Sequence, residues 1–134
     1  MNHTLIIVGV VVGAIVITFV TINILRHRIN PAAYKEKWTD LQRFCAGKET
    51  WPLAIITADK LLDEALKHKR LKGKSMGERL VSAQRTLTDN DSVWFSHNLA
   101  KKLMDDTVTR LNQADVKKSL LGVRQALRDL GVLE

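Results

Sequence analysis

The side chains best suited to chemistry in this 134-residue chain are four histidines and one cysteine. They are His3, His27, His68, His97 and Cys45. Zinc sites use short spacings such as Cys-x-x-Cys or His-x-x-x-His, and no pair here has such a spacing. Gly73 and Gly77 do not form a phosphate-binding loop, and the chain has no serine elbow for acyl transfer. We therefore expect no metal ion and no cofactor.

A run of cations is the strongest electrostatic feature of the chain. This basic cluster consists of Lys67, Lys69, Arg70, Lys72 and Lys74. Its cations suit the negative end of a helix dipole and could form only a solvated helix end. They could instead contact anionic lipids of the inner leaflet, or the phosphates of RNA. If Lys101 and Lys102 shared one face and a groove with the basic cluster, the RNA interpretation would gain support.

His97 ends the run Val93-Trp-Phe-Ser-His97 on a predicted helix. A histidine at such a position either takes part in a functional site or makes a hydrogen bond to a neighbouring helix. We favour the second interpretation, in which a backbone carbonyl of that helix could be the acceptor.

Charge is distributed unevenly along the chain. All 21 Lys and Arg lie at or beyond Arg26, all 14 Asp and Glu lie at or beyond Glu36, and the preceding stretch is apolar. About 20 apolar residues form a helix that crosses the hydrocarbon core of a bilayer. The many β-branched residues favour a strand in water, but in lipid the backbone must satisfy its own hydrogen bonds, so a helix forms. We therefore predict a transmembrane anchor over residues 1–28.

A cleaved signal peptide is the competing interpretation of the same stretch. Signal peptides have a basic start, an apolar stretch of about 7–15 residues and a small-residue cleavage site. The start of this chain, Met1-Asn-His-Thr4, has no Lys or Arg, the apolar run is longer, and no Ala-x-Ala pattern follows it. These features favour an anchor that is not cleaved.

Flanking charges predict the orientation of the anchor in the cell membrane. Arg26, Arg28, Lys35 and Lys37 follow the apolar run, and no Lys or Arg precedes it. Because positive charge is retained in the cytoplasm, we expect a single-pass protein with its N-terminus outside and residues 29–134 in the cytoplasm. The lone Cys45 fits a reducing compartment. Gly9 and Gly13 form a Gly-x-x-x-Gly spacing that would allow two membrane helices to approach closely, although small residues are common in such segments.

The segment 29–134 shows helical periodicity and no alternation typical of strands. Five helices are expected. The first begins at Asn30-Pro31 and ends at Gly47, and the second begins near Thr50. The third follows a capping box formed by Ser75 and Glu78. The fourth follows the caps of residues 89–91, and the fifth runs from residue 112 or 113 to Gly131.

These five helices are joined by short loops, which predicts a compact all-α bundle. The widest apolar stripe belongs to the second helix, which contains Leu53, Ile55 and Leu62, so we expect this helix to be central. On the fourth helix we expect Val93, Trp94, His97, Ala100, Leu103 and Met104 to point inward. Residues 29–33 are too few for a long linker, so the bundle should lie close to the membrane.

Three segments of this bundle resemble a known group of proteins. They are Ile55-Ile-Thr-Ala-Asp-Lys-Leu-Leu-Asp63, Met76-Gly-Glu-Arg-Leu80 and Val93-Trp-Phe-Ser-His97. They resemble uncharacterised bacterial membrane-anchored proteins whose soluble part is similar to the HEPN helical bundles. The resemblance covers most of residues 34–131. It implies a HEPN-like fold and raises the expectation of a homodimer.

The resemblance also implies where ribonuclease residues would lie. In proteins of this group the fourth helix typically carries an aromatic residue followed by Ala-His-x-Leu-Arg-Asn-x-x-x-His-Glu. The HEPN ribonucleases use the Arg and the second His of this pattern to act on RNA. Here the first His is His97, but Ala100 replaces the Arg, Lys101 the Asn, and Asp105 the second His. RNA cleavage needs a proton acceptor and positive charge at the phosphorane, and the charge of Asp105 repels phosphate. We therefore expect no enzyme activity.

Two functional hypotheses follow from these observations. The first is a non-catalytic, membrane-tethered interaction or scaffold module that binds an unidentified protein partner or a second copy of itself. The second is a membrane-associated protein directed at nucleic acid, which binds RNA or keeps weak HEPN-type ribonuclease activity. The substitutions at Ala100 and Asp105 favour the first hypothesis.

Overall fold

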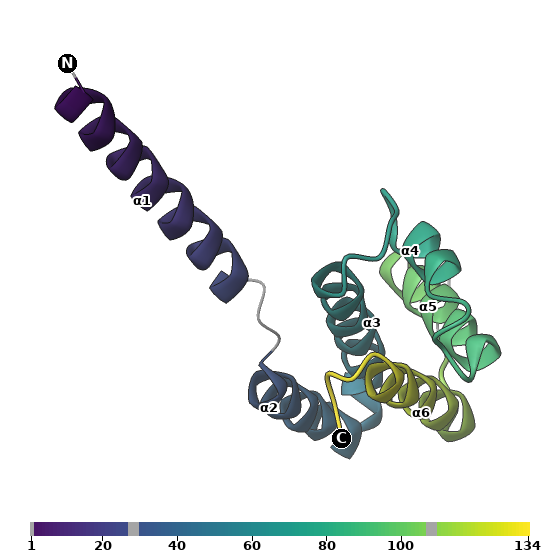
Figure 1. The fold of residues 1–134 in the computed structure, drawn as a ribbon. Helices are drawn as coiled ribbons and strands as arrows, with labels where there is room; N and C mark the ends of the chain where they lie inside the picture. Colours follow the sequence, from purple (N-terminus) through teal and green to yellow (C-terminus); the bar gives the residue numbers. More distant parts are fainter. Residues whose placement is uncertain (1, 27–29, 107–109) are drawn as a thin grey trace.

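A computed structural model of the chain describes residues 2–26, 30–106 and 110–134. Within these ranges the protein is all-helical, with six α-helices, two short 3-10 helices and no strand (Figure 1). The helices are α1 (Asn2–Arg26), α2 (Pro31–Gln42), α3 (Trp51–His68), α4 (Met76–Ser82), α5 (Asn90–Met104) and α6 (Gln113–Asp129). The predicted all-α class and the five helices after the apolar segment are confirmed.

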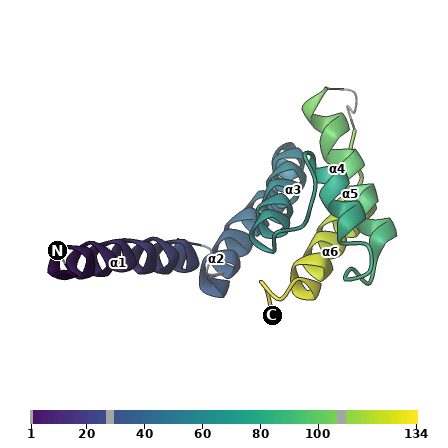
Figure 2. The same cartoon turned by 45° about the horizontal axis from the view of Figure 1, so that its top comes forward.

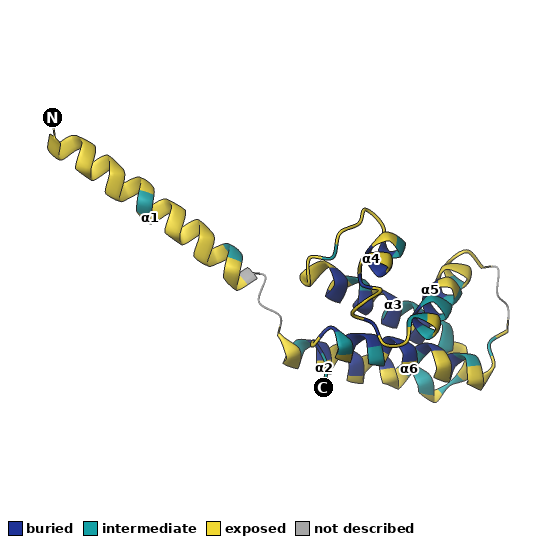
Figure 3. Ribbon diagram, turned by 45° about the vertical axis from the view of Figure 1, so that its right-hand side comes forward, coloured by how far each residue is buried: buried dark blue, intermediate teal, exposed yellow. Residues whose placement is uncertain are grey.

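Helix α1 is one straight rod of 25 residues that stands apart from the other helices (Figure 2). Almost all its side chains are exposed, although nearly all are apolar (Figure 3). The hydroxyls of Thr18 and Thr21 donate to the carbonyls of Ala14 and Ile17, both at 2.8 Å, so their polar groups are satisfied within the helix. By length and composition α1 is able to cross a membrane, a property that signal sequences share.

Helix α3 is the centre of the bundle and packs against α2, α4, α5 and α6. Its buried face is wide, and a single row of apolar residues would not cover four neighbours. The buried residues of α3 are Ala54, Ile55, Ala58, Asp59, Leu61, Leu62, Ala65 and Leu66. The central position of this helix was predicted correctly, but Leu53 is exposed because it lies in the first turn, outside this face.

The beginnings of the helices follow the capping signals in the sequence. The side chain of Asn30 accepts from the backbone N–H groups of residues 32 and 33, and Pro31 occupies the first helical position. Ser75 accepts from the N–H of Glu78, whose carboxylate accepts from the N–H of Lys74, one residue before the cap. Side chains at positions 89 and 112 cap α5 and α6 in the same way. Each cap satisfies backbone donors that have no partner inside the helix.

Helix α2 ends earlier than predicted. It stops at Gln42 and is followed by 3-10 helices over Arg43–Ala46 and Lys48–Thr50, so Gly47 separates two 3-10 segments. Side chains from the start of α3 hold this turn. The indole N–H of Trp51 donates to the carbonyl of Cys45 at 3.1 Å, and the hydroxyl of Thr50 donates to the carbonyls of Phe44 and Gly47. These bonds from side chains to backbone carbonyls favour the tighter helix over further α-helical turns.

Helices α5 and α6 approach each other very closely. A Cβ atom on Gly122 would lie 2.7 Å from the Cβ of Ser92 and 2.9 Å from its carbonyl carbon. Ser96 on α5 and Ser119 on α6 are also fully buried, so small residues are used throughout this contact. One predicted inward residue is wrong: Met104 is exposed, because it is the last residue of α5 and extends past the packed part of the helix.

Candidate functional site

The three segments that carry the family resemblance meet in space, on α3, α4 and α5. Each contributes a buried or half-buried polar residue, and together these form a polar seam of Asp59, Asp63, Arg79 and His97. Asp59 and Asp63 are four residues apart on α3, so they lie on the same face of that helix. The seam is the only place where buried charged side chains meet within the residues that the structure describes.

His97 and Asp59 form a buried pair between α5 and α3. Nδ1 of His97 lies 3.1 Å from Oδ1 and 3.3 Å from Oδ2 of Asp59. Asp59 is 4% exposed and His97 is 8% exposed, and the edge of the Trp94 ring meets the His97 ring with centroids 6.0 Å apart. Burial raises the pKa of Asp59, while the hydrogen bond and the charge of His97 act in the opposite direction. The predicted hydrogen bond of His97 to a neighbouring helix is present, and its partner is the carboxylate of Asp59 on α3.

Arg79 and Asp63 form the second half of the seam and join α4 to α3. Nε of Arg79 donates to Oδ1 of Asp63 at 2.7 Å, and Nη2 donates to Oδ2 at 3.0 Å. The remaining terminal nitrogen donates to the carbonyl of Gly73 at 3.0 Å. This two-pronged geometry is the strongest form of an arginine–carboxylate pair. Lys67 also approaches Asp63, at 3.4 Å, from the solvent side.

A histidine beside a carboxylate is the arrangement that hydrolases use to orient a general base. Such a base also needs substrate within hydrogen-bonding reach. Two surface grooves, of about 550 and 290 Å³, border α2, and no residue of the polar seam lines either of them. In the seam, each charged side chain is paired with a partner on another helix.

The two positions that would act on phosphate in HEPN ribonucleases lie in different surroundings. Ala100 is fully buried and packs in a small apolar cluster with Ile55 and Val116. Asp105 is exposed and follows the last residue of α5. An arginine side chain would not fit at position 100 without displacing this core cluster. Lys101, one turn beyond His97, is exposed.

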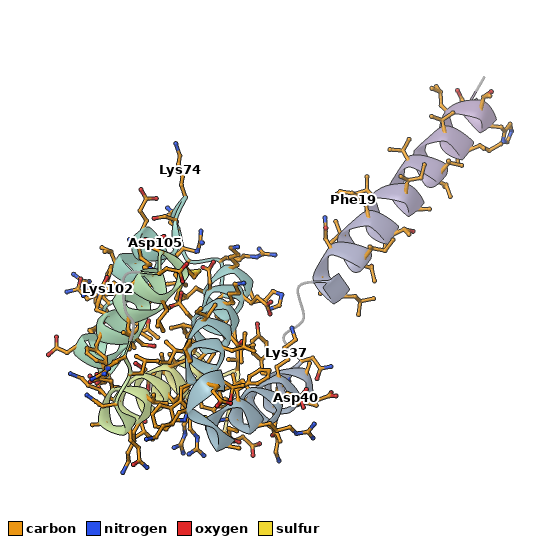
Figure 4. All side chains as sticks on the ribbon, turned by 180° about the vertical axis from the view of Figure 1, so that it is seen from behind. Phe19, Lys37, Asp40, Lys74, Lys102 and Asp105 are labelled. Carbon is orange, nitrogen blue, oxygen red and sulfur yellow. The ribbon has the colours of Figure 1, made fainter. Side chains whose placement is uncertain are left out.

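The basic cluster lies at the end of α3 and in the loop that leads to α4. All five members are exposed, and Lys74 is at the tip of the loop (Figure 4). Lys101 and Lys102 lie beside the other half of α3, because α5 packs Ala100 and Leu103 near the start of that helix. Helix α3 has 18 residues and is about 27 Å long, and neither of the two grooves that border α2 is lined by a member of the basic cluster or by Lys101 or Lys102.

The residues predicted to orient the anchor lie around the junction between α1 and α2. Arg26 is the last residue of α1, and Arg28 lies outside the described residues. Lys35 and Lys37 are exposed on α2, and Nζ of Lys37 lies 3.0 Å from Oε2 of Glu64 on α3.

Gly9 and Gly13 lie one turn apart on α1. A Cβ atom added at either position would meet no atom within 4 Å. This face of the helix is therefore open to another molecule.

The residues considered as metal ligands lie apart. No three His, Cys, Asp or Glu side chains come together as a metal site in residues 2–26, 30–106 and 110–134. Nδ1 of His68 is hydrogen-bonded to the hydroxyl of Tyr34, and Cys45 is half-buried in the turn after α2. His27 lies outside the described residues.

Sequence reasoning singled out His97 but missed Asp59, Asp63 and Arg79. The signal was present, because two carboxylates at a spacing of four interrupt the most apolar helix of the bundle. A charged residue on a buried face needs a partner, and Arg79 and His97 are the buried basic residues of α4 and α5. Comparison of the chain with protein-family models, with curated proteins and with solved structures found no match.

Proposed function

We propose that this chain is a single-pass membrane protein whose helical bundle acts as a non-catalytic interaction module. The observation that carries the proposal is the contrast between α1 and the bundle. Helix α1 is predominantly apolar between Leu5 and Leu25 and is not covered by the rest of the described protein, whereas α2–α6 enclose a core of their own. A lipid bilayer is the environment in which such a helix is stable.

The non-catalytic part of the proposal is supported by the polar seam. Its four side chains pair with one another across α3, α4 and α5. Ala100 is part of the core, where the resemblance implies an arginine. The bundle therefore keeps the polar residues that hold its helices together, while the position that would contact phosphate is apolar.

The orientation that we propose places α2–α6 in the cytoplasm and the start of α1 outside. It is supported by Arg26, Arg28, Lys35 and Lys37, which all follow the apolar segment. A HEPN-like bundle that binds a protein partner or a second copy of the chain is the form of the module that the resemblance suggests. Gly9 and Gly13 would add a contact between two copies in the membrane.

The test is fractionation of cells that express the full chain, followed by alkaline carbonate extraction and mass measurement. We expect the intact chain to stay in the membrane pellet. Release by carbonate would contradict an integral anchor, and a mature protein that has lost α1 would show that the segment is a signal peptide. The purified full chain should also leave labelled RNA intact. Cleavage that disappears in His97→Ala would overturn the non-catalytic assignment.

A further inference from the structure

Three parts of the bundle meet at the end to which α1 is connected: the start of α2, the end of α3 and the tail after α6. The hydroxyl of Tyr34 is hydrogen-bonded to Nδ1 of His68, which joins α2 to the last turn of α3. Lys35 and Leu133 line the same groove between α2 and the tail. Nζ of Lys69 lies 3.9 Å from where a Cβ on Gly131 would be. Figures 1 and 3 show this end of the bundle on the side of α1.

The chain keeps this end close to the membrane surface if α1 is inserted. Arg26 ends α1 and Asn30 caps α2, so only four Cα-to-Cα steps separate them. Each step spans at most 3.8 Å, which places the start of α2 within about 15 Å of the end of the anchor in any conformation. The polar headgroup layer is about 5–7 Å thick on each side of the hydrocarbon core. The start of α2 therefore lies within or directly below the headgroups.

The cations of this end are largely without protein partners. Five of them are exposed and have no carboxylate within 4 Å among the described residues: Lys35, Lys69, Arg70, Lys72 and Lys74. Lys37 and Lys67 are paired with Glu64 and Asp63. Glu36, Glu78 and Glu134 add negative charge nearby: Glu134 lines the same groove as Lys35, and Glu78 is bonded to the backbone of the loop. The five cations, which we call the anchor-proximal surface, remain available to an external anion.

The backbone conformation of Arg70 indicates that the anchor-proximal surface has a role other than stabilising the bundle. Its φ of 58° is in the left-handed region, which at the end of a helix usually belongs to glycine. The backbone bonds of Arg70 to Lys67 and of Leu71 to Leu66 close the end of α3 in the same way as Gly131 closes α6. A non-glycine residue in this conformation costs stability, and the exposed side chain of Arg70 makes no ion pair within the described bundle that would offset this cost.

From these observations we infer that the anchor-proximal surface binds the anionic phospholipid headgroups of the leaflet into which α1 inserts, and that it thereby fixes the bundle against the membrane. The inference rests on the proposed membrane insertion of α1. Lipid headgroups suit the surface because they form a plane of negative charge within reach of the tether. Binding of single-stranded RNA usually adds exposed aromatic side chains, and the described part of the bundle exposes none.

Lysine footprinting of the reconstituted full chain tests this inference. The protein is inserted into vesicles of phosphatidylcholine alone or with phosphatidylglycerol at a ratio of about 7:3, treated with an amine acylating reagent, and analysed by mass spectrometry. We expect Lys35, Lys69, Lys72 and Lys74 to react about threefold more slowly on the anionic vesicles, and salt to abolish the difference. Lys48 and Lys101 are internal controls beside the start of α3, and their reactivity should not change.

Two matched variants sharpen the experiment. Neutralising Lys69, Arg70, Lys72 and Lys74 to Gln should restore the reactivity of Lys35 on anionic vesicles. Neutralising Lys48, Lys101, Arg110 and Lys117, which lie away from the anchor, should leave Lys35 protected. Carbonate extraction of the same vesicles reports insertion of α1 separately. If α1 is inserted and the four lysines react equally on both vesicles, or if only added RNA protects them, the inference is wrong while the proposed anchor stands.

Discussion

The left-handed backbone conformation of Arg70 should lower the stability of the bundle. Because the left-handed region is costly for a residue with a Cβ atom, Arg70→Gly should raise the free energy of unfolding by about 1 kcal/mol. The measurement is urea unfolding of the full chain in detergent micelles. Gly131→Ala is the matched control, since Gly131 has a φ of 74° at the end of α6 and should lose about as much stability as Arg70→Gly gains. A loss of stability in Arg70→Gly would show that the arginine packs usefully within the bundle.

The buried pair of Asp59 and His97 makes the stability of the bundle depend on pH. Burial raises the pKa of Asp59, so the folded state binds its proton more tightly than the unfolded chain does. The free energy of folding that is lost by burying the ionised carboxylate is therefore lost in full at neutral pH. It is regained as the pH falls through the raised pKa of Asp59. His97 reduces this cost, because its hydrogen bond and its charge both favour the ionised form.

The second prediction follows from that balance. His97→Ala should lower the free energy of unfolding by about 3 kcal/mol at pH 7, because it leaves a buried carboxylate without its partner. Part of the loss should return as the pH is lowered from 7 towards the raised pKa of Asp59, since Asp59 becomes easier to protonate in the folded state once His97 is gone. Urea unfolding across this range is the measurement. In Asp59→Asn/His97→Ala the recovery should vanish, and a recovery that persists would assign the effect to another group.

Only part of the polar seam could be predicted from the sequence. His97 was singled out because it follows three apolar and aromatic residues on a helical face. Asp63 and Arg79 look like ordinary surface charges in the sequence, and their burial depends on how α4 is laid across α3. Helical periodicity defines which face of a helix is apolar, but it does not say which helix covers that face.

At the element scale, local chemistry accounts for the beginnings of the helices. Asn30, Ser75, Asp89 and Asn112 each accept a backbone hydrogen bond at the position that the sequence indicated. The end of α2 was predicted wrongly because Trp51 and the residue before it bond back to that turn from the next helix. Bonds within one element are therefore predictable here, and bonds between elements are not.

The contact of α5 with α6 gives the third prediction. Gly122→Ala should lower the free energy of unfolding by about 2 kcal/mol, because the added Cβ would lie 2.9 Å from the backbone of Ser92 and the helices would have to move apart. Gly77→Ala is the control, since Gly77 is also helical but its nearest neighbour, on Trp94, would be 3.7 Å away. That control should be neutral or gain up to about 1 kcal/mol from helix propensity. Equal losses in both variants would contradict the close approach at Gly122.

At the scale of the whole molecule, two parts with different surfaces are joined by a short connection. Helix α1 exposes apolar side chains all round, whereas the bundle exposes charged ones and keeps its apolar residues inside. In the membrane-spanning arrangement that we propose, the connection lies where hydrocarbon and water meet. Four cations lie on the bundle side of this boundary, within about 11 residues of the end of α1, so charge can decide which way the chain inserts.

The four cations that follow the apolar segment should determine the orientation of the chain in the membrane. Replacing Arg26, Arg28, Lys35 and Lys37 with Gln should invert the orientation in a measurable share of molecules. The next basic residue is Arg43, which lies near the limit of the roughly 15–20 residues over which flanking charges act. Protease added to intact cells that lack an outer barrier should then digest the bundle in the inverted molecules. Neutralising Lys48, Lys101, Arg110 and Lys117 removes the same charge farther along the chain, beyond the distance over which loop charges act, and should leave the bundle protected. Equal protection of both variants would mean that the apolar segment and the folding of the bundle, rather than the flanking charges, determine the orientation.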